Sequence, residues 1–184
     1  MKRIKKTLVS LLLGAASTLC LVDKVNAQDN RHLFVANESG SIKEFSINGT
    51  TCIPFGTFKT LGAGASPQML TFSPWNNNLL VAVNYGVGKN GVFEYDRNGG
   101  NLVHDYAISN NAYGLDYGTD KDLFTTSGFL GNPGDPGIGE VYRFDGQTRD
   151  FLGLFISANN SGGLNGPHSL KFGPDGNLYV YLRT

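Results

Sequence analysis

Gly166-Pro-His-Ser-Leu-Lys-Phe-Gly-Pro-Asp-Gly-Asn-Leu-Tyr-Val180 contains two short strand patterns joined by a well-marked turn. From Ser169 to Phe172 polar and apolar residues alternate, which is the period of a half-buried strand, and Leu178 to Leu182 is a second run of strand formers. Between them, the proline and aspartate of Gly173 to Asn177 favour a tight turn, and its second glycine accepts the positive φ that closes one. The stretch therefore predicts an antiparallel β-hairpin.

Segments with an aromatic strand followed by a glycine turn recur along the chain. In each segment, a β-branched residue is followed three positions later by an aromatic residue and then by a glycine. The aromatic residues are Phe45, Tyr95 and Phe144, so the spacing between segments is nearly constant. Self-similarity at a nearly fixed period indicates a repeat architecture.

A second repeated pattern runs beside the first. It centres on Leu70, Leu115 and Leu170, whose spacing varies moderately around the same period. A polar turn and an apolar strand follow each leucine, and these apolar strands are expected at residues 79–83, 123–126 and 178–182. Residues 32–36 resemble the same apolar strand without a strand before it, and residues 150–156 have the pattern of a last strand. Each unit therefore has four short strands.

Four short antiparallel strands in each repeat of about 50 residues predict an all-β chain with the architecture of a β-propeller. A β-sandwich or barrel is the alternative, but it would not repeat the same order of turns. We expect three four-stranded blades and part of a fourth in an incomplete ring. The blades are expected at about residues 31–64, 65–111, 112–165 and 166–184.

The number of blades is smaller than a ring needs, because closed propellers have about four to eight. We therefore expect a fragment of a longer protein, with ring closure by several copies of the chain as the alternative. Each end of the arc would leave an apolar face in water. We accordingly expect that residues 28–184 alone do not form a well-folded monomer.

Residues 1–27 have the pattern of a secretory signal peptide. A basic segment, an apolar run from Leu8 to Val22 and a small residue at Ala27 follow one another. The apolar run is shorter than the roughly 20 residues that cross a bilayer, so a signal peptide is favoured over a membrane anchor. The bulky Leu19 disfavours a lipoprotein site at Cys20. We expect residues 28–184 to lie in the periplasm or the extracellular space, without a transmembrane segment.

Charge and cysteine content restrict the partners and the redox chemistry. Five of the 15 basic and one of the 15 acidic side chains lie in residues 1–27, so the rest of the chain carries a net charge near −4. Without a basic cluster, binding to nucleic acid or to an anionic membrane is not expected. Cys52 is the single cysteine of residues 28–184, so we expect no internal disulfide there and a small buried side chain rather than a reactive thiol.

Residues 167–180 and 141–146 resemble blades of the NHL-repeat superfamily, and the resemblance extends over residues 31–184. That superfamily includes six-bladed gluconolactonase and regucalcin-type enzymes and seven-bladed streptogramin lyases. The matching residues belong to turns and cores, so the resemblance implies the fold and leaves the activity open. We favour a secreted binding module for a carbohydrate, a peptide or a surface partner.

The alternative function is a metal-dependent lactonase-type hydrolase or a streptogramin-lyase-like enzyme whose site is completed by further blades. Only this alternative implies a cofactor, which would be a calcium or zinc ion. The residues flanking Glu38 and Asn84 match no motif of the gluconolactonase-like enzymes, so no metal ligand is assigned.

By analogy with related propellers, six residues are expected on one rim. They are Gln68, Tyr113 and His168 at the starts of initial strands, and Glu38, Asn84 and Ser127 at the ends of second strands. Carboxylate, amide and hydroxyl oxygens suit a sugar or a divalent ion. His168 is a weak candidate for a catalytic base because imidazole titrates near neutral pH, although a role in the turn fits it equally well. Solvated strand ends explain these residues without any ligand.

Two further features have structural interpretations. Residues 130–138 form a Gly- and Pro-rich insertion that is expected to cover the rim without binding a metal. Trp75 is expected to pack in the core or between blades.

Overall fold

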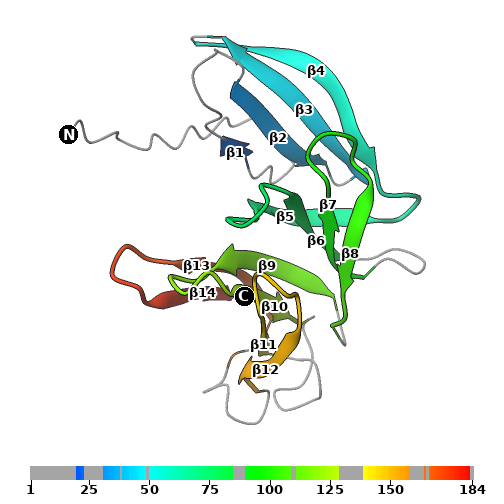
Figure 1. The fold of residues 1–184 in the computed structure, drawn as a ribbon. Helices are drawn as coiled ribbons and strands as arrows, with labels where there is room; N and C mark the ends of the chain where they lie inside the picture. Colours follow the sequence, from blue (N-terminus) through cyan, green and yellow to red (C-terminus); the bar gives the residue numbers. More distant parts are fainter. Residues whose placement is uncertain are drawn as a thin grey trace, which may run out of the picture.

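The computed structural model (Figure 1) describes residues 20–22, 31–37, 39–48, 50–84, 90–108, 111–128, 139–157, 164 and 166–182. These residues form 14 β-strands and no helix, so none of them forms a helix able to cross a membrane. The all-β class predicted from the repeats is confirmed. The strands are β1 (Cys20–Val22), β2 (Arg31–Asn37), β3 (Ser41–Asn48), β4 (Thr51–Thr60), β5 (Ser66–Phe72), β6 (Leu79–Asn84), β7 (Gly91–Tyr95), β8 (Leu102–Tyr106), β9 (Ala112–Tyr117), β10 (Leu123–Ser127), β11 (Glu140–Phe144), β12 (Phe151–Ile156), β13 (Pro167–Phe172) and β14 (Leu178–Leu182).

Consecutive strands pair into four antiparallel sheets. The first sheet is β1–β4, the second β5–β8, the third β9–β12, and the fourth consists of β13 and β14. The initial strands of neighbouring sheets lie against one another, since β5 contacts β1 and β9, and β9 contacts β13. Figure 1 shows the first sheet at the top, the second below it, and the third and fourth at the bottom. The division into three four-stranded sheets and a partial fourth agrees with the repeats.

Local turn chemistry explains the hairpin of the fourth sheet. β13 and β14 pair antiparallel on either side of the predicted turn. In that turn the Gly176 amide donates a hydrogen bond to the Gly173 carbonyl at 3.0 Å, and Asp175 Oδ1 accepts one from the Asn177 amide at 3.1 Å. Gly176 has a φ of 80°, a left-handed conformation that favours glycine. The hairpin prediction is therefore confirmed down to its turn.

The two repeated patterns mark equivalent positions in successive sheets. Leu70, Leu115 and Leu170 lie in the initial strands of the second, third and fourth sheets, and all three are buried. Tyr95 and Phe144 are buried in the third strands, where each pairs with the first residue of the strand before it. Phe45 has the same place in the first sheet and pairs with Leu33.

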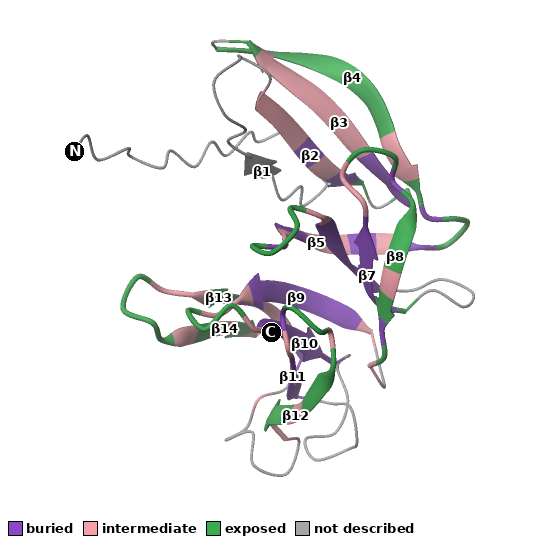
Figure 2. Cartoon of the chain, in the orientation of Figure 1, coloured by how far each residue is buried: buried purple, intermediate pink, exposed green. Residues whose placement is uncertain are grey.

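Apolar cores fill the spaces between neighbouring sheets. The core between the first and second sheets includes Phe34 and Leu79, and the core between the second and third includes Leu80 and Phe144. The core between the third and fourth sheets includes Phe124, Val141 and Leu170. Phe172 and Leu178 pack against this core and are half-buried. Figure 2 shows that exposed residues concentrate on the outer strands β4, β8 and β12.

The first sheet contains a strand that the sequence patterns do not indicate. β1 pairs with β2, with Leu21 opposite Phe34, so the prediction that residues 32–36 lack a preceding strand is wrong. β1 lies within the segment 1–27 that is predicted to be a signal peptide, and the first sheet begins before the predicted blade boundary at residue 31. Its residues belong to a continuous apolar run, in which a strand has no alternation to mark it.

The structure bears on two single-residue predictions. Cys52 is exposed on the outer strand β4, so the prediction of a buried thiol is wrong. Trp75 is 44% exposed, but it does connect two sheets. Its Nε1 donates to the Lys121 carbonyl of the β9–β10 turn at 3.3 Å, and the Lys121 ammonium lies 4.8 Å from the centre of the indole ring. Residues 130–138, the expected cover of the rim, lie outside the described residues.

Candidate functional site

The described rim candidates lie where the initial strand of each sheet begins and its second strand ends. Antiparallel pairing brings these two positions together, with Ser66 opposite Asn84 and Ala112 opposite Ser127. Glu38 lies outside the described residues. Within the strands, Gln68, Tyr113 and His168 stand near the starts of β5, β9 and β13, and Asn84 and Ser127 are the last residues of β6 and β10.

Tyr113 and His168 form a contact between the third and fourth sheets. Their ring centroids are 5.1 Å apart, with an angle of 38° between the ring planes. Tyr113 is 5% exposed, whereas His168 is half-buried, so the phenol ring supports an imidazole that still reaches solvent. Gly114 allows this approach, because a Cβ at its position would lie 2.7 Å from the backbone nitrogen of Leu170.

Gln68 and Asn84 lie together at the corresponding end of the second sheet. Gln68 Nε2 donates to Ser66 Oγ at 2.7 Å and to the Ser66 carbonyl at 3.2 Å. Asn84 is 4% exposed, and its Oδ1 is buried without a hydrogen-bond partner. Alternation along β6 places Asn84 on the same face as Ala82, which belongs to the core between the second and third sheets. A buried unpaired carbonyl oxygen is uncommon in folded proteins.

The third sheet adds a buried carboxylate that the sequence interpretation does not include. Glu140 is 7% exposed, pairs with Ser127 across β10 and β11, and accepts a hydrogen bond from the Tyr142 hydroxyl at 2.8 Å. Ser127 is fully buried. The described residues contain no group of three or more His, Cys, Asp or Glu side chains arranged to hold a metal ion.

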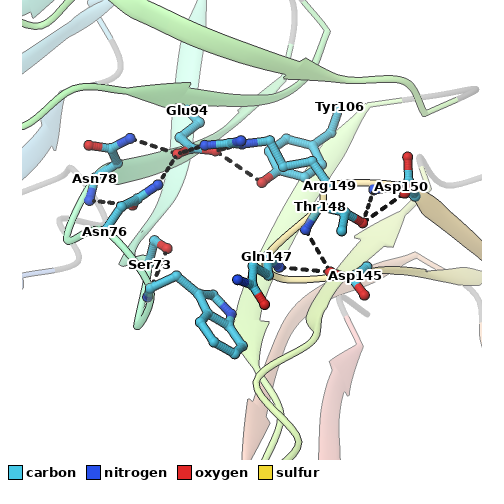
Figure 3. A network of polar contacts seen from close by, with 11 residues as sticks. Ser73, Asn76, Asn78, Glu94, Tyr106, Asp145, Gln147, Thr148, Arg149 and Asp150 are labelled. Atoms are coloured by element: carbon cyan, nitrogen blue, oxygen red, sulfur yellow. Dashed lines mark hydrogen bonds and ion pairs between the residues drawn. The ribbon is translucent and has the colours of Figure 1, made fainter.

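A second polar cluster, shown in Figure 3, joins the second and third sheets around Glu94. Glu94 is 1% exposed and is the residue before the last in β7. Arg149 Nε donates to Glu94 Oε2 at 2.7 Å, and Arg149 Nη2 donates to Oε1 at 3.0 Å. The side chains of Asn76 and Asn78 donate to Oε1 at 2.9 and 2.7 Å, and the Tyr106 hydroxyl donates to Oε2 at 3.1 Å. We call these five residues the Glu94 cluster.

The Glu94 cluster holds its carboxylate in the charged state. Burial raises the pKa of Glu94, but the hydrogen bonds from Arg149, Asn78 and Asn76 outweigh burial and bring the pKa down to about 2. For Tyr106, burial and the neighbouring carboxylate raise the phenol pKa far above its usual value, so its hydroxyl remains a donor. Because all four neighbouring side chains donate hydrogen bonds to the charged Glu94 carboxylate, the cluster stabilises the contact between the second and third sheets.

A tight turn presents Arg149 to the second sheet. Asp145 Oδ1 accepts hydrogen bonds from the amides of Gln147 and Thr148 at 2.8 and 2.7 Å, and the Arg149 amide donates to the Asp145 carbonyl at 2.9 Å. The backbone hydrogen bonds from Thr148 and Gln147 lower the pKa of Asp145. Arg149 has a φ of 73°, a conformation that non-glycine residues adopt at a cost. The turn and the ion pair with Glu94 together hold that conformation.

The third and fourth sheets are joined by a simpler contact. Asp116 of β9 accepts from Lys171 Nζ and from the Phe172 amide of β13, both at 2.9 Å. The Asp116 side chain is 9% exposed, while that of Lys171 is 75% exposed. The Glu94 cluster and Asp116 are therefore inter-sheet contacts, and the rim residues are the described candidates for ligand binding.

Comparison with known proteins supports the fold and does not identify a family. No protein family and no curated protein sequence matches this chain. A crystal structure of a protein of unknown function from Bacteroides caccae is similar to it, with a TM-score of 0.54 and 14% sequence identity. The match covers 90% of this chain and 54% of the other, so this chain spans about half the length of that structure. At this identity the similarity shows the fold alone.

Proposed function

We propose that this chain is a partial β-propeller of the NHL type, secreted, and that it binds a partner at the rim formed by the starts of β5, β9 and β13. The order of the sheets supports the propeller arrangement, since four consecutive antiparallel sheets contact one another through their initial strands. In such an arrangement equivalent residues of successive blades are neighbours around the axis. Gln68, Tyr113 and His168 occupy equivalent positions.

The observation that carries the proposal is the contact between Tyr113 and His168. It joins two rim residues that are far apart in sequence and come from neighbouring sheets. The rings lie on strands that pack on an apolar core, so the site is held by rigid elements. A preorganised site loses little conformational entropy when a ligand binds.

The chemistry of the rim favours a ligand with hydroxyl or amide groups, and we propose a carbohydrate. The half-buried imidazole of His168 has an aromatic face and ring nitrogens that form hydrogen bonds. The Gln68 amide lies at the equivalent place in the second sheet and carries a donor and an acceptor. A sugar presents an apolar face and a ring of hydroxyl groups, which matches this combination.

The test is to screen the purified chain against immobilised glycans and to measure each positive by isothermal titration calorimetry. We expect His168→Ala to weaken binding at least tenfold, roughly the loss of one well-made ligand contact. Gln147→Ala is the matched control, because Gln147 is exposed in the β11–β12 turn at the opposite end of the third sheet. Absence of binding to every glycan, or equal affinity of the His168→Ala variant, would reject the proposal.

The same preparation separates binding from catalysis. Lactone hydrolysis is assayed with and without added calcium or zinc. Metal-dependent turnover would show that the protein is a hydrolase, and the proposal of a binding module would then be wrong.

A further inference from the structure

Two buried polar side chains lie at the rim end of the core between the second and third sheets. Asn84 is the last residue of β6 and Glu140 is the first residue of β11, and they are 4% and 7% exposed. Alternation places Asn84 on the face of Ala82 and Glu140 on the face of Tyr142. Ala82 and Tyr142 belong to one apolar core. Asn84 and Glu140 therefore face the same space between the two sheets.

The described residues leave acceptor capacity in both side chains. Asn84 Oδ1 is buried and has no hydrogen-bond partner among them. Glu140 accepts a hydrogen bond from one described side chain, that of Tyr142, and no described lysine, arginine or histidine forms an ion pair with it. Glu94, the other buried glutamate of the described residues, accepts hydrogen bonds from four side chains, including Arg149. Buried charges are normally paired, so Glu140 lacks the cation that Glu94 has.

The repeat itself does not require these two residues. Glu140 lies four residues before the repeated aromatic residue of its sheet, and the residues at that place in the first and second sheets are Ser41 and Gly91. The residue of the third sheet equivalent to Asn84 is Gly128, because β6 and β10 pair alike with the strands that follow them. Strand pairing thus proceeds without an amide or a carboxylate at these positions. Their combination is particular to the interface between the second and third sheets.

The chemistry of the two groups favours a positively charged hydrogen-bond donor. A primary ammonium group carries three N–H donors and no acceptor, and its hydrogen bonds to a carboxylate are strong. Calcium takes about six to eight oxygen ligands. The part of the chain that the structure describes holds no group of three or more His, Cys, Asp or Glu side chains arranged around one point. One carboxylate and one amide oxygen therefore match an ammonium group better than a calcium ion.

We propose that Asn84 and Glu140 form a subsite for a primary ammonium group, and that the ligand at the rim is an amino sugar. Glu140 neutralises the ammonium charge, and Asn84 Oδ1 accepts one of its N–H groups. The proposal rests on the carbohydrate site at Tyr113 and His168. Ser127 connects the two places, since it pairs with Glu140 on one side and with the residue before Tyr113 on the other. The ammonium subsite and the aromatic contact therefore lie at the same end of the third sheet.

The first measurement compares two sugars on the wild-type protein. Glucosamine and N-acetylglucosamine share one ring, but acetylation removes the ammonium charge. We titrate each into the 15N-labelled chain and follow the side-chain amide signals of Asn84 by NMR. Glucosamine should bind roughly tenfold more tightly or better, since an unpaired buried charge gains a partner, and it should shift the Asn84 signals. Equal affinity for the two sugars, or glucosamine binding that leaves the Asn84 signals unmoved, would show that the subsite does not exist.

The second measurement removes the charge of the subsite. Glu140→Gln retains an oxygen that accepts from the Tyr142 hydroxyl, and it should weaken glucosamine binding by roughly tenfold or more while leaving N-acetylglucosamine binding unchanged. The matched control is Asp105→Asn, which removes one negative charge from an exposed position of β8 and should change neither affinity. A Glu140→Gln variant that binds glucosamine as tightly as the wild type contradicts the proposal.

Further probes separate failure of the subsite from failure of the carbohydrate site. If His168→Ala weakens both sugars and Glu140→Gln weakens neither, the carbohydrate site stands and the ammonium subsite is wrong. If methylammonium chloride shifts the Asn84 signals but neither sugar binds, the subsite is supported and the carbohydrate site is wrong. If calcium chloride alone shifts the Asn84 signals and Glu140→Gln abolishes that shift, the two residues bind a metal ion, and the ammonium assignment is overturned.

Discussion

The guanidinium of Arg149 donates two hydrogen bonds to the carboxylate of Glu94, which lies 55 residues earlier in the chain and in the neighbouring sheet. The Glu94 side chain is 2% exposed and that of Arg149 is 28% exposed. Removing one member of a buried, hydrogen-bonded charge pair leaves the other without compensation. This pair is therefore the most sensitive described polar contact between the second and third sheets.

Replacing Glu94 by Gln should destabilise the protein by about 2 to 4 kcal/mol, because Arg149 loses its anionic partner in a mostly buried site. Urea unfolding measures the change. Arg149→Met should cost a similar amount, and the double variant should cost less than the sum because the two residues act together. The control is Arg143→Met, whose partners Asp120 and Asp122 lie nearer the surface, with an expected cost below about 1 kcal/mol. Fully additive losses for Glu94 and Arg149 would contradict this expectation.

The stability of the protein should fall in acid partly through Glu94. Its pKa is about 2 in the folded state and 4.5 without the fold. Because the folded pKa is the lower one, the stabilisation is complete above about pH 4.5 and is lost as the pH falls toward 2. The shift corresponds to about 3 kcal/mol at about 1.4 kcal/mol per pH unit. Thermal unfolding of the wild type and of Glu94→Gln between these pH values measures the effect, and curves that stay parallel would rule it out.

Gly114→Ala should disturb the contact between Tyr113 and His168. A Cβ at this position would lie 2.7 Å from the Leu170 backbone nitrogen and 2.9 Å from Thr126 Oγ1. Backbone must move to accept it, and overpacking of this kind costs about 1 to 3 kcal/mol. We expect a lower urea midpoint and a changed NMR chemical shift of the His168 ring, which lies beside the Tyr113 ring. Unchanged values of both would show that the third and fourth sheets separate easily.

The signal-peptide prediction and β1 use the same residues. Cleavage after Ala27 would remove β1 and leave the edge of β2 unpaired, and only three residue pairs would be lost. We expect the exported chain to begin at Gln28. Mass spectrometry of the exported protein determines the first residue. A chain that retains Met1 would show that β1 belongs to the mature protein.

Local patterns predicted the strands because the determining contacts are local. Leu170 belongs to an alternating strand pattern and Asp175 to a tight turn, and both features depend only on neighbours in sequence. Strands joined by such turns pair into the observed sheets. Cys52 was predicted wrongly because strand composition does not show which outer strand lacks a covering neighbour.

The Glu94 cluster was not predicted because Glu94 and Arg149 meet only after two sheets have packed. One signal was present in the sequence: Glu94 is a carboxylate in the otherwise apolar and fully buried strand β7. A buried charge requires a partner, but its identity depends on how the sheets stack. The same limit applies to the rim. The strand pattern predicts the end of the sheet on which Tyr113 and His168 lie, but it does not predict that their rings are in contact.

The order of strands within the sheets has a consequence for synthesis. Each strand pairs with the next one in sequence, so the contact order within a sheet is low and long loops need not close first. At about 5 to 20 residues per second, a ribosome needs roughly 2.5 to 10 s to make one repeat of about 50 residues, far longer than a hairpin takes to form. The second sheet should therefore resist protease in ribosome-bound chains from which Ile108 has emerged. During those seconds the newest sheet exposes an apolar face, and this interval is when the nascent chain is most open to capture by chaperones.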